Sequence, residues 1–198
     1  NLFFTNSFTG FIYGRVDDNT SNVRLMKTTN GGMNWNVAQN FSGFGQLYFT
    51  GNDTGYAVSN NAFIKTYNGG LNWSTSYINN LNGASVNKLS VISNQKIVAA
   101  GGTGEIIKTI NAGLNWTNYT KSILDANFVE AGFCDINTGY ISGYDGKVYR
   151  TTNGCISFDT LKPTLPYSWY IYTMSVVNKN VIYGAAGDKV YKTTNAGT

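Results

Sequence analysis

The sequence predicts an all-β fold built from short, repeated sheets. Three observations support this: a nine-residue segment recurs at intervals of about 40 residues, no window keeps a 3.6-residue apolar period, and the apolar runs are short and rich in β-branched and aromatic residues. An interval of this size suits one four-stranded blade of a β-propeller. We therefore expect a single β-propeller domain or propeller fragment over residues 1–198, with five visible blades, the last incomplete, at approximately 1–40, 41–80, 81–122, 123–165 and 166–198.

Each unit along the chain shows the same order of segments before the repeated segment. An apolar strand comes first, followed by a polar turn that ends in Thr-Gly, as at Thr9-Gly10, Thr54-Gly55 and Thr138-Gly139, or in an equivalent pair. A strand of small residues, a loop of Gly, Asp or Asn, and a strand ending in a cation and threonine follow. This order predicts three short strands ahead of each repeated segment.

The repeated segment reads Lys-Thr-x-Asn-Gly-Gly-x-Asn-Trp in its clearest copies. Its first asparagines are 38, 43, 42 and 42 residues apart, and we take them as structural residues of the repeat: Asn30, Asn68, Asn111, Asn153 and Asn195. Asparagine hydrogen-bonds backbone two residues on, and the glycines reach positive φ without strain. Each copy therefore predicts a tight turn between the third and fourth strands of a blade.

A tryptophan follows this turn in the first three copies, at Trp35, Trp73 and Trp116. We interpret it as a structural wedge between neighbouring blades that buries about 150–250 Å². The cation that opens each copy, Lys27 in the first and Arg150 in the fourth, is interpreted as solvated at the end of a strand.

The pattern Thr-x-Asn-x-Gly-x-x-Trp resembles the Asp-box or BNR repeat, with asparagine where the aspartate usually stands. Together with the Thr-Gly-Tyr element at Tyr56 and Tyr140, the chain resembles the photosystem II stability and assembly factor-like branch of β-propellers, as found in secreted proteins of Bacteroidetes-type bacteria. The resemblance covers nearly the whole chain, and it implies an extracellular or cell-surface location, with the periplasm as an alternative. It is specific for the fold and not for function, because BNR propellers include sialidases, xyloglucan-type endoglucanases and assembly chaperones.

Composition excludes several functional classes. With 42% hydrophobic and 12% charged residues the chain is globular, and the absence of histidine excludes Ser-His-Asp triads and histidine-based phosphotransfer. The net charge of +4 involves no basic run, so we expect no nucleic-acid partner. No apolar stretch reaches the roughly 20 residues that cross a bilayer, so we expect no membrane insertion, and no motif indicates a cofactor or metal site.

The candidate catalytic residues do not form a recognisable set. Arg15, Arg24 and Arg150 are the only arginines, and they do not match the arginine triad of sialidases. No spacing marks a pair among the ten acidic residues, as a glycosidase would require. We therefore favour a non-catalytic propeller that binds a protein or carbohydrate partner, with a fragment of a propeller glycoside hydrolase as one alternative.

One rim of the propeller is the expected binding surface. Trp169 is the only tryptophan outside the repeated position, and it lies in a loop with several tyrosines. Such loops share a rim with the loops between second and third strands, where aromatic and polar side chains suit a sugar or a partner's loop. The alternative, that the tyrosines cover a degenerate blade, stays open. The candidate residues are Trp169, Tyr167, Tyr170, Arg15, Asp145 and Asp188.

Cys134 and Cys155 lie at turns expected at one end of blade four, and we predict a disulfide between them. The fourth repeated segment has lost its second glycine and its tryptophan, and a covalent link would compensate for poorer packing. An intervening strand separates the two turns by about 10 Å unless one turn folds over it.

The last blade has no fourth strand in the sequence. An unclosed sheet edge exposes unpaired backbone, so we expect either that the chain is part of a longer propeller or that another chain donates the missing strand. The second possibility would make the protein a structural subunit that self-assembles through its incomplete last blade.

Overall fold

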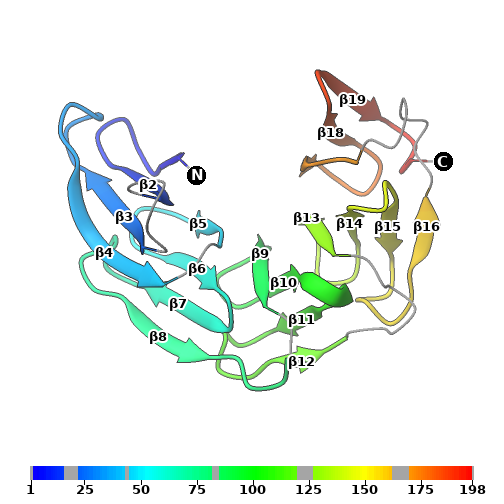
Figure 1. Cartoon of the computed structure of the whole chain (residues 1–198), viewed down its shortest axis with the longest axis horizontal. Coiled ribbons are helices and arrows are strands. Elements are labelled where there is room, and N and C mark those ends of the chain that lie inside the picture. Colours follow the sequence, from blue (N-terminus) through cyan, green and yellow to red (C-terminus); the bar gives the residue numbers. More distant parts are fainter. Residues whose placement is uncertain are drawn as a thin grey trace. The chain divides into compact units, whose positions relative to one another are not determined.

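The computed structural model describes residues 2–15, 22–42, 45–81, 85–119, 127–161 and 170–197. These residues form five antiparallel sheets, four of them with four strands and the last with three (Figure 1). Their only helical element is one 3₁₀ turn, η1 (Gly102–Gly104). The predicted all-β propeller with an incomplete last blade is confirmed.

The chain divides into two compact units, Asn1–Asn79 and Asn80–Thr198. The first unit holds blade 1, with strands β1 (Leu2–Phe4), β2 (Gly10–Arg15), β3 (Asn22–Thr28) and β4 (Asn36–Ser42). It also holds blade 2, with β5 (Leu47–Phe49), β6 (Gly55–Ser59), β7 (Ala62–Thr66) and β8 (Ser74–Tyr77). The first strands of the two blades, β1 and β5, contact each other.

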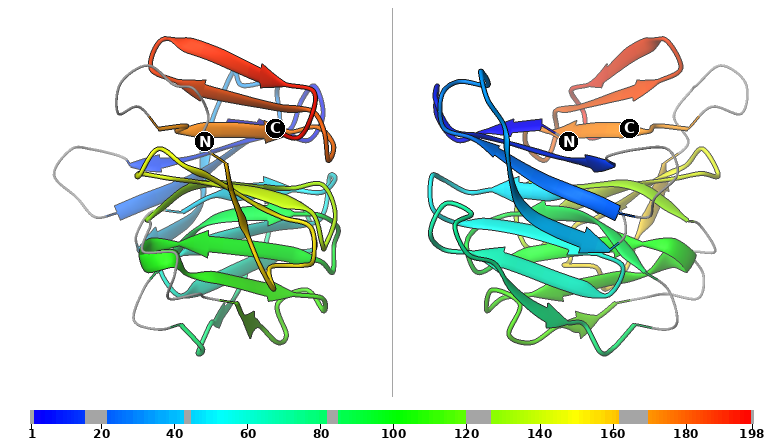
Figure 2. Two further views of the ribbon diagram at one scale, coloured as in Figure 1. Left: turned by 90° about the vertical axis from the view of Figure 1, so that its right-hand side faces the viewer. Right: turned by 60° about the vertical axis from the view of Figure 1, so that its left-hand side comes forward.

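The second unit holds blades 3 to 5. Blade 3 consists of β9 (Val86–Val91), β10 (Ile97–Gly101), β11 (Ile106–Thr109) and β12 (Thr117–Asn118), and blade 4 of β13 (Phe128–Phe133), β14 (Gly139–Gly143), β15 (Val148–Thr151) and β16 (Asp159–Leu161). Blade 5 has β17 (Thr173–Val176), β18 (Ile182–Ala186) and β19 (Lys189–Thr193). The first strand of blade 4 contacts those of both neighbours, so consecutive sheets of this unit meet along their inner strands (Figure 2). Whether all five blades form one domain stays a prediction.

Within each unit the core lies between consecutive sheets, and the second strands of blades 2, 3 and 4 are buried along their whole length. Every residue of β6, β10 and β14 is buried. Their small residues leave space for the large side chains of neighbouring strands. In the Thr-Gly element the glycine pairs with a phenylalanine of the first strand, Phe4 with Gly10 and Phe49 with Gly55. A Cβ at these glycines would lie 2.8 and 2.6 Å from the ring, which explains why the element needs glycine.

The repeated segment forms the turn between third and fourth strands in each of the four four-stranded sheets, as predicted. In every copy the threonine hydroxyl donates to the asparagine Oδ1, as Thr28 does to Asn30 at 2.9 Å, and accepts from a backbone N–H four residues on. In the first four copies, the asparagine Oδ1 accepts from a backbone N–H four residues on, as from Asn34, rather than two. The longer span closes the whole turn with one side chain.

The tryptophans are half-buried at the end of their blades. Trp73 packs against the core cluster that blades 1 and 2 share, in agreement with the wedge interpretation. The ring of Trp35, however, lies edge-on to Phe4 of its own blade, with the centroids 6.2 Å apart. No helix in the described ranges is long and apolar enough to span a membrane.

Candidate binding site

A groove lies between blades 4 and 5 of the second unit. It has a volume of about 270 Å³ and opens to solvent along the two sheets. Its walls come from β14, β15 and β16 on one side and from the strands and last turn of blade 5 on the other. The residues that line it are Tyr140, Val148, Leu161, Ile171, Met174, Ile182, Gly184, Tyr191, Lys192, Thr193, Asn195, Ala196 and Gly197.

The interface that holds the groove differs from the interfaces of blades 1 and 2 and of blades 3 and 4 in the cation that opens the repeated segment. Lys27 of blade 1 donates its ammonium to the Gly69 carbonyl in the turn of blade 2, at 2.5 Å. Lys108 of blade 3 donates to the Gly154 carbonyl of blade 4 at 2.8 Å. In blades 1 and 3 the repeated lysine therefore joins its blade to the turn of the next, and the prediction that Lys27 and Lys108 are solvated is wrong.

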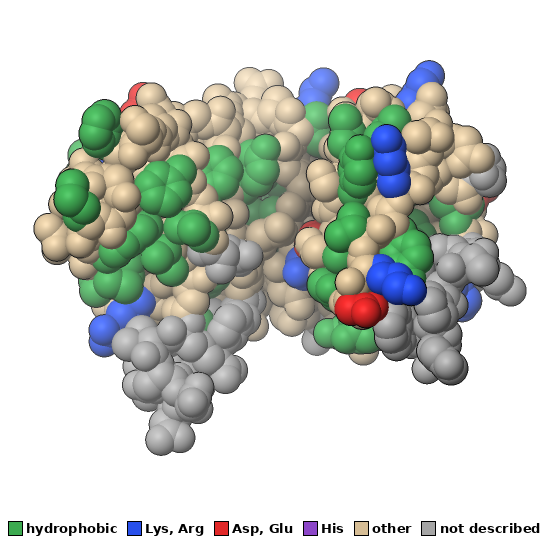
Figure 3. Space-filling view, turned by 90° about the horizontal axis from the view of Figure 1, so that it is seen from above, with side chains coloured by type: hydrophobic (Ala, Val, Ile, Leu, Met, Phe, Trp, Pro, Cys, Tyr) green, Lys and Arg blue, Asp and Glu red, His purple; other side chains and the backbone are tan. Residues whose placement is uncertain are grey.

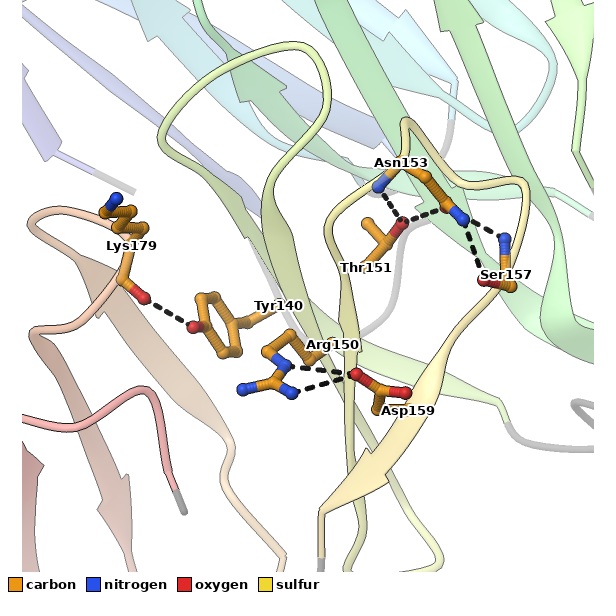
Figure 4. A network of polar contacts seen from close by, with 7 residues as sticks. All are labelled: Tyr140, Arg150, Thr151, Asn153, Ser157, Asp159 and Lys179. Atoms are coloured by element: carbon orange, nitrogen blue, oxygen red, sulfur yellow. Dashed lines mark hydrogen bonds and ion pairs between the residues drawn. The ribbon is translucent and has the colours of Figure 1, made fainter.

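Blade 4 carries Arg150 at this position, and its guanidinium bonds within its own blade. Nη2 and Nε donate to Asp159 Oδ2 at 2.9 and 3.3 Å, as Figure 4 shows. Asp159 lies on β16, beside Arg150 in the register of the sheet. The ion pair holds the arginine on its own sheet, which distinguishes this interface from those bridged by Lys27 and Lys108.

Two hydrogen bonds hold blade 5 against blade 4 along the groove. The Tyr140 hydroxyl donates to the Lys179 carbonyl at 2.7 Å, and the Ser142 hydroxyl donates to the Ile171 carbonyl at 2.8 Å. Burial raises the pKa of Tyr140, and the nearby Arg150 charge partly opposes this. Tyr140 therefore keeps its proton and acts as a donor at neutral pH.

The walls of the groove are mainly apolar. Leu161, Ile171, Met174 and Ile182 belong to the apolar cluster shared by the two blades. The hydroxyl of Tyr191 is buried and has no hydrogen-bond partner among the described residues. A buried hydroxyl without a partner costs free energy, so a ligand that hydrogen-bonds Tyr191 would gain from the contact.

Tyrosines gather where the loops of blades 4 and 5 meet. Tyr170 contacts Tyr144 of the β14–β15 loop edge-on, with the ring centroids 4.7 Å apart. Tyr172 donates its hydroxyl to the Gly187 carbonyl at 2.7 Å, in the turn that carries the exposed Asp188. The structure thus places Tyr170 and Tyr172 beside the loops that carry Asp145 and Asp188, and the role of these residues in binding stays a prediction.

The other predicted rim residues are placed as follows. Asp145 accepts from the Tyr149 hydroxyl at 2.6 Å and pairs with the Lys147 ammonium at 2.9 Å, so it is engaged within its own loop. Burial opposes ionisation of Asp145, but these hydrogen bonds lower its pKa. Trp169 and Tyr167 lie outside the described residues. Arg15 ends β2 in the other unit, and its side chain is outside the described part.

The candidate residues chosen from the sequence did not include Tyr144 and Tyr172, although both lie in the loops expected at the rim, and the groove itself was not predicted. The signal for the groove was the arginine in the lysine position, together with an aspartate nine residues later. Its meaning was hidden because the acceptor of the repeated lysine lies 42 or 46 residues away.

The predicted disulfide is absent, since Cys134 and Cys155 are both free thiols. Cys155 is completely buried in the core cluster of blades 3 and 4, and burial raises its pKa to about 12. Cys134 instead donates to the Thr138 carbonyl at 3.5 Å in the turn before β14. The lost second glycine is thus replaced by a small buried side chain that packs in the core rather than forming a covalent link.

Two buried carboxylates have structural partners in blades 3 and 4. Glu130 of β13 lies 3.7 Å from the Lys88 ammonium on β9, and burial raises its pKa although Lys88 partly opposes this. Glu105 accepts from the Asn118 amide at 2.6 Å. Among the described residues, no three His, Cys, Asp or Glu side chains are grouped to hold a metal ion.

No family model and no curated protein matches the chain. Solved structures do match it. YCF48 from Cyanidioschyzon merolae is 18% identical with a TM-score of 0.69, over 96% of this chain and 65% of that chain. YCF48 bound to a D1 peptide is 17% identical with a TM-score of 0.52, over 100% of this chain and 78% of that one. The Niastella koreensis GH74 enzyme is 18% identical with a TM-score of 0.72, over 98% of this chain and 36% of that one.

These matches establish a β-propeller of the kind found in YCF48 and GH74 proteins. The chain spans less than two thirds of the Cyanidioschyzon merolae and Niastella koreensis chains. At these identities the likeness concerns the fold.

Proposed function

We propose that this protein is a non-catalytic β-propeller that binds a protein partner, taking an apolar side chain of an extended peptide segment into the groove between blades 4 and 5. The observation that carries the proposal is the groove itself, an apolar opening at the interface where Arg150 bonds to Asp159 on its own blade. An extracellular or cell-surface location is part of the proposal and rests on the sequence resemblance.

The size and chemistry of the groove favour a peptide side chain. Its volume of about 270 Å³ lies just below the roughly 300–1,000 Å³ of small-molecule pockets, which suits one or two side chains. Leu161, Met174 and Ile182 offer apolar contact, and Tyr191 also lines the groove. Buried apolar anchors with a few polar contacts are typical of interface hot spots.

The tyrosine rim beside the groove extends this surface. Tyr144, Tyr170 and Tyr172 supply flat amphipathic area that loses little conformational entropy on binding. YCF48, a similar fold, has been solved with a bound peptide, which supports a peptide as the class of partner.

A glycoside hydrolase remains the weaker candidate. Hydrolysis of a glycosidic bond requires two carboxylates on either side of it. The described residues that line the groove include no carboxylate, so this site does not supply that chemistry.

The test is to select peptides from a displayed random library on the wild-type protein and to compare their affinity for two variants. Met174→Trp fills the groove from β17, whereas Met33→Trp adds the same bulk at a position that is 80% exposed in the turn of blade 1. We expect Met174→Trp to weaken binding at least about tenfold and Met33→Trp to leave it unchanged.

Two results would contradict the proposal. One is that no peptide is enriched, or that the enriched peptides bind Met174→Trp as tightly as the wild type. The other is that soluble oligosaccharides bind and Met174→Trp abolishes their binding, which would make the partner a glycan.

A further inference from the structure

A second pocket lies in the first unit, at the repeated turn of blade 2. It has a volume of about 280 Å³ and opens to solvent. Lys65 and Ser74, the pair of the β7–β8 ladder nearest the turn, line it together with residues of the turn that joins these strands. All of its lining residues belong to blade 2, so a single blade forms the site. We call it the turn pocket.

Two aromatic side chains, Tyr67 and Trp73, line the turn pocket. Hydrophobic side chains reach the surface of the first unit, as Figure 3 shows for one face of the molecule. The Tyr67 side chain is 56% exposed. The corresponding position holds threonine or isoleucine in the other four copies of the repeated segment. The turn of blade 2 therefore carries an aromatic ring at a position where the other turns have none.

Contacts within the blade hold both rings in place. The Trp73 indole N–H donates to the Gly70 carbonyl at 3.2 Å. The ammonium of Lys65 lies 5.5 Å from the centre of the Tyr67 ring. A site that is formed before the ligand arrives loses less conformational entropy on binding. The turn pocket is therefore suited to bind a ligand without rearrangement.

The polar groups that the turn offers to a ligand are side-chain amides. The backbone N–H groups of residues 68–72 all donate within the protein, so they do not serve the main chain of a peptide or an anion. Oδ1 of Asn68 accepts from the Thr66 hydroxyl and from the Asn72 N–H. Nδ2 of Asn68 and the side-chain amide of Asn72 have no hydrogen-bond partner among the described residues.

This combination of rings and amides matches the chemistry of a sugar ring. A sugar has a face of C–H groups, which packs on an aromatic ring, and hydroxyls that both donate and accept hydrogen bonds. A side-chain amide also carries both a donor and an acceptor, so it can bond such hydroxyls. The residues that line the turn pocket include no carboxylate, which argues against a cationic ligand.

We propose that the turn pocket of blade 2 binds a neutral sugar residue of a glycan. The sugar stacks on the Tyr67 ring and forms hydrogen bonds with the amides of Asn68 and Asn72. This site is separate from the groove between blades 4 and 5, and it adds a glycan ligand to the peptide partner proposed for that groove.

The experiment screens the full chain on an array of neutral oligosaccharides and titrates those that bind in solution. Tyr67→Thr introduces the residue that three other copies of the turn carry, so the fold is preserved. Tyr77→Thr is the matched control, because Tyr77 is 66% exposed on β8 and does not line the turn pocket. The NMR signal of the Trp73 indole N–H reports whether the sugar binds at this turn.

We expect at least one neutral oligosaccharide to bind and to shift the Trp73 indole signal. Tyr67→Thr should weaken this binding at least about tenfold, whereas Tyr77→Thr and the groove variant Met174→Trp should leave it unchanged. An array without a bound oligosaccharide, or binding that Tyr67→Thr does not weaken, would overturn the proposal. Library peptides whose binding is lost in Tyr67→Thr would also overturn it, because they would make the turn pocket a peptide site.

Discussion

At the scale of single residues, the repeated turn depends on one threonine and one asparagine. Thr66 donates to Asn68 Oδ1 and accepts from the Gly70 N–H, both at 3.0 Å. The threonine is 1% exposed, so water does not replace these bonds when they are lost. Its backbone partner is one of the groups that a turn leaves without a ladder partner.

Thr66→Val should lower the free energy of unfolding by about 1–3 kcal/mol. Valine has nearly the shape of threonine but no hydroxyl, so the buried Gly70 N–H loses its hydrogen-bond acceptor. Thr193→Val removes the same bonds from the half-buried turn of blade 5, where Gly197 is exposed and water replaces the lost partner. Denaturant unfolding of the two variants checks this. Equal losses would show that burial is not what makes the bonds matter.

The two cysteines should behave as unequal free thiols. We expect the unreduced, denatured protein to label at two thiols, and the folded protein to label at Cys134 well before Cys155. The thiolate is the reactive form, and burial that raises the Cys155 pKa to about 12 suppresses it at neutral pH. Labelling of fewer than two thiols in the unreduced, denatured protein would instead support the disulfide between Cys134 and Cys155.

At the scale of elements, the cation at the end of the third strand has different partners at different blade interfaces. Lys108 donates to the Gly154 carbonyl across the interface of blades 3 and 4. Arg150 donates to Asp159 on its own sheet, and the interface of blades 4 and 5 carries the groove. The interface of blades 3 and 4 has a lysine bond across it, whereas the interface of blades 4 and 5 has an arginine bound within blade 4 and a groove.

Lys108→Met should destabilise the protein by about 1.5–3 kcal/mol, because it removes a charged donor and keeps the apolar stem. Lys192→Met is the matched control, since Lys192 occupies the same position in blade 5 and contacts the Tyr183 ring of its own blade, and it should stay within about 0.5 kcal/mol of the wild type. Thermal unfolding measures both. Similar effects of the two variants would mean that the bond to Gly154 contributes little.

At the scale of the whole molecule, stability should be uneven along the chain. Inner blades are buried on both faces, whereas blades 1 and 5 each expose one face. In repeat architectures each unit draws its stability from its neighbours, so an end unit with one neighbour opens more readily.

Hydrogen exchange of the dilute protein should therefore protect the amides of β14 more strongly than those of β18, and those of β6 more strongly than those of β2. Mass spectrometry of peptides from the four strands measures this. Equal protection of inner and end strands would contradict it.

By itself the sequence determined the all-β fold, the five sheets, the turns at Asn30 and its counterparts, and the missing last strand. The strands follow from the short-range pattern of apolar residues, and the turns follow from residues within about ten positions of one another. Both depend on interactions between residues that are close in the sequence. The sequence also predicted a binding rim that includes Tyr170 and Asp145, and their role in binding stays a prediction. Only the tertiary structure decided which carbonyls accept from Lys27 and Lys108 and that Cys155 is buried. It also decided that Arg150 binds Asp159 at the interface with the groove. Those outcomes depend on side chains about 40 residues apart, whose contacts arise when neighbouring sheets pack.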